Sequence, residues 1–252
     1  MGLGVIWREM KAFSRWFWDG RAGKRTPWIR RSFAILFGLF LVLPVALLLI
    51  FRFVPVPFTP QVVIGFVSGD DVHYAWREWG DISPYLGRAV IGAEDEKFCT
   101  HHGFDWEAID KVWKSHERHP KRRMRGASTI SQQAARSLFA TSTRNWVRKG
   151  VEAYETVLME LLWPKRRILT VYLNTVDWGH GNYGAEAASQ AYFGKPASDL
   201  TQTEAARLAA ILPNPDKWKA VKPGPYVTRR TGKLAGHMAQ VRRDGLDWCL
   251  QD

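Results

Sequence analysis

Cysteine is scarce in this chain, which has only Cys99 and Cys249 among its 252 residues. No C-x-x-C pair is present, so the sequence supports neither a zinc finger nor a disulfide-stapled scaffold. Pairing of the two cysteines would need close and aligned Cβ positions, and at their wide separation in sequence it is the less favoured alternative. The HExxH and EF-hand motifs are also missing, which excludes the zinc and calcium sites that these motifs mark.

Acidic residues are also in short supply, because 36 Lys and Arg against 24 Asp and Glu give a net charge of +12. Such a charge indicates an anionic partner: nucleic acid, acidic lipid or a phosphorylated substrate. The length and the 46% hydrophobic content allow one substantial domain with an attachment. The 13 Trp residues suit sugar or membrane-interface contacts, although Trp more commonly packs within a core.

One long run without charge stands out, FAILFGLFLVLPVALLLIF at residues 33–51. As a helix it would span about 28 Å, which matches the hydrocarbon layer of a membrane, and Pro44 is expected to bend it. A cleaved signal peptide is disfavoured, because the run is long and VPVPFTP offers no small-x-small cleavage site. The basic residues before the run predict a cytoplasmic N-terminus, with acidic lipid rather than nucleic acid as their partner. They are residues 8, 11, 15, 21, 24, 25, 30 and 31.

These features predict four parts: a basic cytoplasmic segment at 1–32, a transmembrane helix at 33–51, an extended proline-rich linker at 52–61 and a folded domain at 62–252. VVIGFV at 62–67 is typical of a short strand. HERHPKRRMR at 116–125 predicts a mobile loop, with a solvated connector and a binding role both open. Elsewhere the 3.6-residue repeat predicts a mainly α-helical domain. The expected helices are 82–93, 145–163, 165–174, 185–193 and 202–212.

The stretch VIGAEDEKFCTHHGFD at residues 90–105 crowds acids and histidines together. Clusters of this kind can be metal ligands, acid/base catalysts or the solvated end of a helix. A second stretch, RGASTISQQAARSLF at residues 125–139, has capping-box spacing at Thr129 and Gln132, which predicts a helix start with free N–H groups and hence an anion site. Thr129, Gln133 and Arg136 would share one face of that helix, and an ordinary polar face is an equal alternative.

The third stretch, RNWVRKGVEAY, places Arg148 four residues and Lys149 three residues before Glu152. On a helix both cations reach that carboxylate and should keep it ionised. A surface salt bridge would look the same from sequence. Glu94 and Glu152 would nevertheless form two separate carboxylate sites, which we call the two carboxylate stations. Sugar-transfer chemistry uses two carboxylates that face each other across a cleft. Nearby cations could serve a leaving diphosphate.

At these residues the sequence closely resembles the family 51 peptidoglycan glycosyltransferases, in particular the monofunctional members with one transmembrane helix. EDEKFCTHHGFD matches E-D-x-x-F-x-x-H-x-G-x-D, GASTISQQ matches G-x-S-T-I-x-Q-Q, and RKGVE matches R-K-x-x-E. Two later blocks, RRILTVYLNTVDWGHGNYGAEAASQAYFGK and TEAARLAAILPNP, follow in order. The resemblance covers residues 83–218 and implies a lysozyme-like α fold with a smaller membrane-associated lobe.

The resemblance also implies roles. Glu94 would be the general base that takes a proton from the acceptor sugar's 4-hydroxyl, and Glu152 would hold cations or a divalent metal, Mg or Mn, near the departing diphosphate. Of the substrate-site residues, Asp95, Phe98 and His101 would mainly hold Glu94 in place. The expected substrate-binding residues are Asp95, Phe98, His101, Ser128, Thr129, Gln132, Gln133, Arg136, Arg148 and Lys149.

Several positions depart from the family pattern. Arg136 stands where Lys is usual, and a guanidinium still pairs with phosphate, so we expect altered kinetics rather than loss of function. Ala127 replaces a second Gly, Cys99 replaces an aromatic residue and Thr170 replaces a Glu. We expect neither Cys99 nor Thr170 to be essential.

The implied activity is polymerisation of a lipid-linked disaccharide-pentapeptide, lipid II, into a β-1,4 glycan, with inversion and release of undecaprenyl diphosphate. The implied partners are this substrate, the growing glycan, the membrane and cell-wall synthesis or division proteins, with no nucleic acid. The expected location is the bacterial inner membrane with the domain outside. With no S-x-x-K motif, an acyl-transfer activity is not expected. The alternatives are a lytic transglycosylase or lysozyme-like hydrolase, and a non-enzymatic wall-binding protein.

Overall fold

The computed structural model describes residues 27–120, 126–139 and 146–251. The chain forms two compact units, Met1–Leu47 and Leu48–Asp252. Most of the predicted basic segment, residues 1–26, lies outside the described residues, as do residues 121–125 of the predicted mobile loop. The predictions for these segments therefore stay predictions.

The apolar run forms helix α2, Pro27–Phe51, with Pro44 inside it. Its stretch Arg31–Phe51 has a mean hydropathy of 3.0, and by length and composition it can cross a membrane. Its large apolar side chains, from Phe33 to Ile50, are mostly exposed. The predicted transmembrane helix is thus present as a helix of sufficient length and apolarity.

The strand predicted at residues 62–67 is wrong, because this segment is helix α3, Pro60–Ser68. The Thr59 hydroxyl accepts a hydrogen bond from the Val62 N–H, Pro60 occupies the first turn, and Gly69 ends the helix with φ 81°. Start and stop signals thus outweigh the β preference of the Val and Ile residues, which is weak by itself. The last two residues of the predicted linker, Pro60 and Gln61, also belong to α3.

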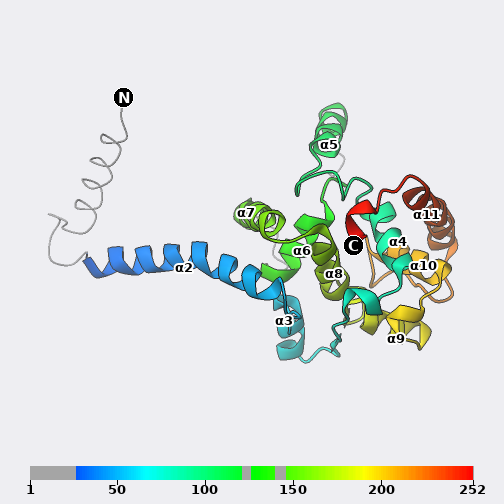
Figure 1. Cartoon of the computed structure of the whole chain (residues 1–252), viewed down its shortest axis with the longest axis horizontal. Helices are drawn as coiled ribbons and strands as arrows, with labels where there is room; N and C mark the ends of the chain where they lie inside the picture. The colour runs from blue at the N-terminus through cyan, green and yellow to red at the C-terminus, as the bar shows by residue number, and fades with distance from the viewer. Residues whose placement is uncertain (1–26, 121–125, 140–145, 252) are drawn as a thin grey trace. The chain divides into compact units, whose positions relative to one another are not determined.

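The second unit is mainly α-helical, as predicted (Figure 1). Helices α4, α10 and α11 pack on one another, and α6 packs on α7 and α8. The buried apolar side chains of both groups belong to one continuous core. The bounds are α4 Pro84–Glu94, α6 Ile130–Phe139, α7 Trp146–Leu162, α8 Lys165–Thr175, α9 Ala185–Phe193, α10 Gln202–Ile211 and α11 Pro225–Arg243, with 3-10 turns η1 Trp79–Asp81, η2 Ala197–Asp199 and η3 Trp248–Leu250.

Two short strands, β1 His73–Tyr74 and β2 Asn182–Tyr183, pair in parallel with His73 opposite Asn182. Gly181 precedes β2 with φ 76°, and a Cβ there would lie 2.0 Å from the Asp71 carbonyl oxygen. Only glycine allows the two segments to approach this closely. The pair therefore ties the chain after α3 to the chain before α9.

Helix α5, Trp106–Arg118, has no buried residue among those it contains, and it projects from the rest of the unit in Figure 1. Asp105 caps it by accepting a hydrogen bond from the Ala108 N–H at 2.9 Å. The helix includes His116 and Arg118, so the loop predicted at 116–125 begins too early. The i,i+4 ion pairs Lys111–Glu107 and Lys114–Asp110 help to extend the helix.

Cys99 and Cys249 form a disulfide with a Cα–Cα distance of 5.4 Å. The sequence disfavoured this pairing because the residues lie 150 positions apart. The fold brings them together, since η3 at the end of the chain returns to the core and buries Leu250. Separation along the chain does not limit a contact that tertiary packing makes.

Candidate active site

A cleft of about 400 Å³ lies beside the C-terminal end of α4. The acidic turn after α4, the turn before α6, and α11 all contribute to its walls. Glu94 is the last residue of α4, so the helix end presents its carboxylate to this cleft. The lining residues are Gly92, Ala93, Glu94, Asp95, Glu96, Lys97, Asp105, Ala108, Lys111, Gly126, Ala127, Ser128, Thr129 and His237.

Glu94 is mostly buried, with 18% of its side chain exposed. Its Oε2 accepts a hydrogen bond from Gln133 Nε2 at 3.1 Å, and its Oε1 lies 3.9 Å from Arg230 Nη2. Burial raises the pKa of Glu94, while the Gln133 hydrogen bond and the charge of Arg230 oppose that rise. A carboxylate whose pKa moves toward neutral pH is a better proton acceptor than an exposed one.

Asp95, the next residue, uses its carboxylate inside the protein. It lies 2.9 and 3.0 Å from His101 Nε2, and its Oδ2 accepts a hydrogen bond from the Ile130 N–H at 2.9 Å. His101 Nδ1 accepts a hydrogen bond from the Gly103 N–H, so Nε2 carries the proton that it donates to Asp95. The pair therefore fastens the turn after α4 to the start of α6.

Phe98 is fully buried and packs edge-on against the His101 ring, with centroids 6.3 Å apart. Lys165 Nζ lies 4.7 Å from the centre of the Phe98 ring. Phe98 thus anchors the turn in this structure, and its place among the substrate-binding residues stays a prediction.

The predicted capping box at the start of α6 is present. The Gln132 N–H donates to Thr129 Oγ1 at 3.2 Å, and the Thr129 N–H donates to Gln132 Oε1 at 3.1 Å. However, the N–H groups at this helix start are not free, because Asp95 accepts from Ile130 and both capping residues are buried. Asp95 thus occupies the Ile130 N–H, and the phosphate site expected at this helix start stays a prediction.

Ser128 remains open to a ligand at this turn. Its Oγ is buried, lines the cleft and has no hydrogen-bond partner within the described parts of the chain. Gln133, one turn further, holds Glu94, and Arg136 is exposed. The three residues predicted to share one face of α6 therefore have different roles: Thr129 caps the helix, Gln133 contacts Glu94, and Arg136 is an exposed cation.

The second carboxylate station lies on α7. Glu152 is buried, with Arg148 Nη1 at 2.7 Å from its Oε2 and the Lys149 ammonium paired with its Oε1. The predicted contacts of both cations are confirmed. Within the described residues these three do not line the cleft, so the expectation that Glu94 and Glu152 face each other stays a prediction.

Three residues at or near these stations were not anticipated. Arg230 and His237 come from α11, more than 130 positions after Glu94, and sequence periodicity cannot reveal that contact. His237 Nδ1 lies 3.1 Å from the Gly92 carbonyl oxygen, an approach that Gly92 permits because a Cβ there would lie 3.0 Å from His237 Cβ. Glu155 is buried one turn after Glu152, and burial together with the charge of Glu152 raises its pKa to about 8.

Comparison with known proteins bears on this arrangement. A family model described as Transglycosylase matches residues 61–239. A protein of Caulobacter vibrioides named biosynthetic peptidoglycan transglycosylase is 51% identical over 219 residues, which are 86% of this chain and 95% of the relative. Proteins with the same name from Rhodospirillum centenum and Chromohalobacter salexigens are 47% identical over 225 residues (89% and 96%) and 46% identical over 227 residues (85% and 94%). The chain belongs to the transglycosylase family.

Proposed function

We propose that this chain is a membrane-anchored, monofunctional peptidoglycan glycosyltransferase that polymerises lipid II into a β-1,4 glycan and releases undecaprenyl diphosphate. The observation that carries the proposal is Glu94, a mostly buried carboxylate at a cleft, held by Gln133 and accompanied by cations on neighbouring helices. The relatives' shared name, biosynthetic peptidoglycan transglycosylase, supports the general activity of peptidoglycan transglycosylation.

Glu94 would act as the general base. As the acceptor sugar's 4-hydroxyl oxygen attacks the anomeric carbon of the donor, its proton passes to Glu94 and the bond from that carbon to the diphosphate oxygen breaks. Attack from the opposite face gives inversion. Gln133 and the Asp95–His101 pair would keep the carboxylate aimed, because a base must lie within hydrogen-bond reach of the proton that it takes.

The departing diphosphate needs positive charge rather than a proton. Arg136 on α6, with Arg148 and Lys149 on α7, would supply that charge, and the unpartnered hydroxyl of Ser128 would donate a further hydrogen bond. Glu152 would orient its two cations toward the phosphates. This assigns to Glu152 a positioning role and to the cations the contact with substrate.

The expected divalent cation fits this site poorly. Both oxygens of Glu152 are engaged with cations, and the described residues contain no group of three or more metal-binding side chains. We infer that Mg or Mn, where activity needs it, binds to the substrate diphosphate. Activity should then fall with excess chelator in proportion to free metal, while thermal unfolding of the protein without substrate stays unchanged; a chelator-induced loss of stability would contradict this.

We place the domain outside the inner membrane, with the N-terminus in the cytoplasm. The helix α2 and the basic residues before it support this orientation. The Cys99–Cys249 disulfide supports it independently, because disulfides persist in oxidising compartments. The proposed partners are the growing glycan and other cell-wall synthesis or division proteins, and the basic charge would serve lipid and diphosphate rather than nucleic acid.

The test uses the full-length protein in detergent with lipid II. Glu94→Gln keeps the shape of the side chain and removes the base, so polymerisation should fall by about 100-fold or more. Glu117→Gln, which removes an exposed carboxylate on α5, is the control and should keep full activity. Unchanged polymerisation in Glu94→Gln would refute the assignment.

A second arm separates the rival functions. The same protein is incubated with finished glycan, on which a lytic transglycosylase or lysozyme-like hydrolase would release short fragments without making polymer. A wall-binding protein would bind the glycan and leave both substrates unchanged. Polymer from lipid II without fragments from glycan is the expected result.

A further inference from the structure

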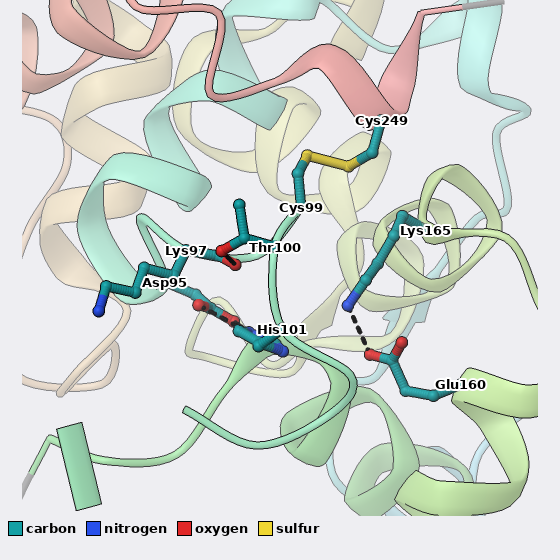
Figure 2. Close-up of a disulfide and its surroundings, with 8 residues drawn as sticks. All are labelled: Asp95, Lys97, Cys99, Thr100, His101, Glu160, Lys165 and Cys249. Carbon is teal, nitrogen blue, oxygen red and sulfur yellow. Dashed lines mark hydrogen bonds and ion pairs between the residues drawn. A yellow bond between two sulfur atoms is a disulfide. The ribbon is translucent and has the colours of Figure 1, made fainter. Parts of the chain in front are cut away.

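The Cys99–Cys249 disulfide lies close to the proposed catalytic machinery. Cys99 belongs to the turn between α4 and α5, four residues after Asp95 and two before His101, and Cys249 belongs to η3. Figure 2 shows the bond at Cys99, within this turn, and Asp95 pointing toward His101 below it. The bond thus joins the end of the chain to the segment that supports Glu94.

The C-terminal segment has a second attachment. Arg88 Nε on α4 donates to Asp247 Oδ2 at 2.8 Å, and the side chain of Asp247 is only 8% exposed. Arg88 lies six residues before Glu94, and Cys99 lies five residues after it. One short segment, residues 247–249, is therefore fastened to the chain on both sides of Glu94.

Besides the disulfide, the turn is held to the rest of the fold by the Ile130 N–H, which donates to Asp95, and by His237 Nδ1, which lies 3.4 Å from Glu96 Oε1. Glu96, Lys97 and Thr100 are exposed, and Phe98 is the large buried side chain between Asp95 and His101. The backbone hydrogen bonds within the turn, such as Thr100 N–H to the Lys97 carbonyl, are local. The disulfide adds to these contacts a covalent link between the turn and the C-terminal segment.

We propose that the disulfide is a positioning device for Glu94, which fixes residues 95–101 against the C-terminal segment and thereby holds the Asp95–His101 pair beside the base. This rests on the role of Glu94 in the proposed function. The cations assigned to the diphosphate lie on α6 and α7, which the disulfide does not join. Loss of the bond should therefore disturb the chemical step more than substrate binding.

The variant is Cys99→Ser/Cys249→Ser in the full-length protein, assayed with lipid II well below its unfolding temperature. We expect kcat to fall about tenfold with KM unchanged. The control is Leu200→Ala, a buried residue before α10 that lies outside both segments in the sequence and whose truncation should also lower stability; its kcat should match the wild type. A double variant that stays folded with wild-type kcat would overturn the inference, because the disulfide would then contribute only to stability.

A second measurement does not depend on activity. Hydrogen exchange of the peptide covering residues 95–105 should become faster in the double variant, while exchange in α7 stays as in the wild type. Equal protection of residues 95–105 in both proteins would count against the inference, as would free thiols in wild-type protein purified from the membrane. If the wild type makes no polymer, the proposed function fails while the exchange experiment still tests the disulfide.

Discussion

Glu94 and Asp95 are adjacent carboxylates with different surroundings. The Asp95 carboxylate accepts hydrogen bonds from His101 and from the Ile130 N–H, whereas Glu94 borders the cleft and has one neutral hydrogen-bond donor, Gln133. A carboxylate that is committed to internal donors is a structural group, and one that keeps an open side can exchange a proton with a substrate. Environment, rather than residue type, separates their tasks.

Gln133→Ala tests this difference through pH. The base must be ionised, so kcat/KM is lost as the pH falls through the Glu94 pKa, which burial already raises. The Gln133 hydrogen bond favours the ionised form; its removal should raise that pKa further and move the acid limb of the kcat/KM profile to higher pH. Ser137→Ala, on the same helix, should leave the limb in place, and an unmoved limb in Gln133→Ala would count against Glu94 as the titrating base.

At the scale of elements, α7 carries two acidic residues one turn apart. Glu152 has two cationic partners, whereas Glu155 is buried with one carboxylate oxygen unpartnered in the described structure. Burial, followed by the charge of Glu152, raises the pKa of Glu155 to about 8. Glu155 is therefore protonated at neutral pH, and α7 carries one acidic charge at this point rather than two.

Glu155→Gln should reveal that proton as a change in stability. Folded Glu155 keeps its proton up to a pH of about 8, whereas the unfolded side chain loses it near its ordinary pKa of about 4.3. The free energy of unfolding of the wild type should thus fall across this window, by at most about 1.4 kcal/mol per pH unit. Gln cannot ionise, so thermal unfolding should show the variant more stable than the wild type at pH 8 and equal to it near pH 4. Glu117→Gln should show no such dependence; equal stabilities of wild type and Glu155→Gln at pH 8 would place the Glu155 pKa near its ordinary value.

The signals at helix ends explain which helices the sequence predicted correctly and which one it missed. The start of α6 and the stop of α7 before Pro164 follow signals visible in the sequence. For α3 the apolar and β-branched composition indicated a strand, although Thr59, Pro60 and Gly69 were already present as helix signals. Giving the caps more weight than the composition would have identified this helix.

At the scale of the whole molecule, the orientation across the membrane decides which compartment the cleft meets. A C-terminal fusion to alkaline phosphatase, which is active only after export, should be active, and a fusion to green fluorescent protein should be dark. The same fusions after deletion of α2, residues 27–51, should give the opposite pair. A fluorescent full-length fusion would contradict the proposed orientation and, with it, access to a substrate outside the membrane.

The sequence by itself determined what local pattern can carry: an apolar helix of membrane-spanning length, a mainly α-helical domain, the capping box of α6, and the i,i+3 and i,i+4 pairs around Glu152. These depend on residues a few positions apart, and the spacing of a helix is fixed. Only the tertiary structure decided which groups surround Glu94. Arg230, His237 and Cys249 reach the site from the C-terminal part of the chain, and the Asp95 carboxylate takes the Ile130 N–H at the start of α6. Such contacts follow from how α4, α6 and α11 pack, and the burial that sets the Glu94 and Glu155 pKa values exists only once that packing has formed.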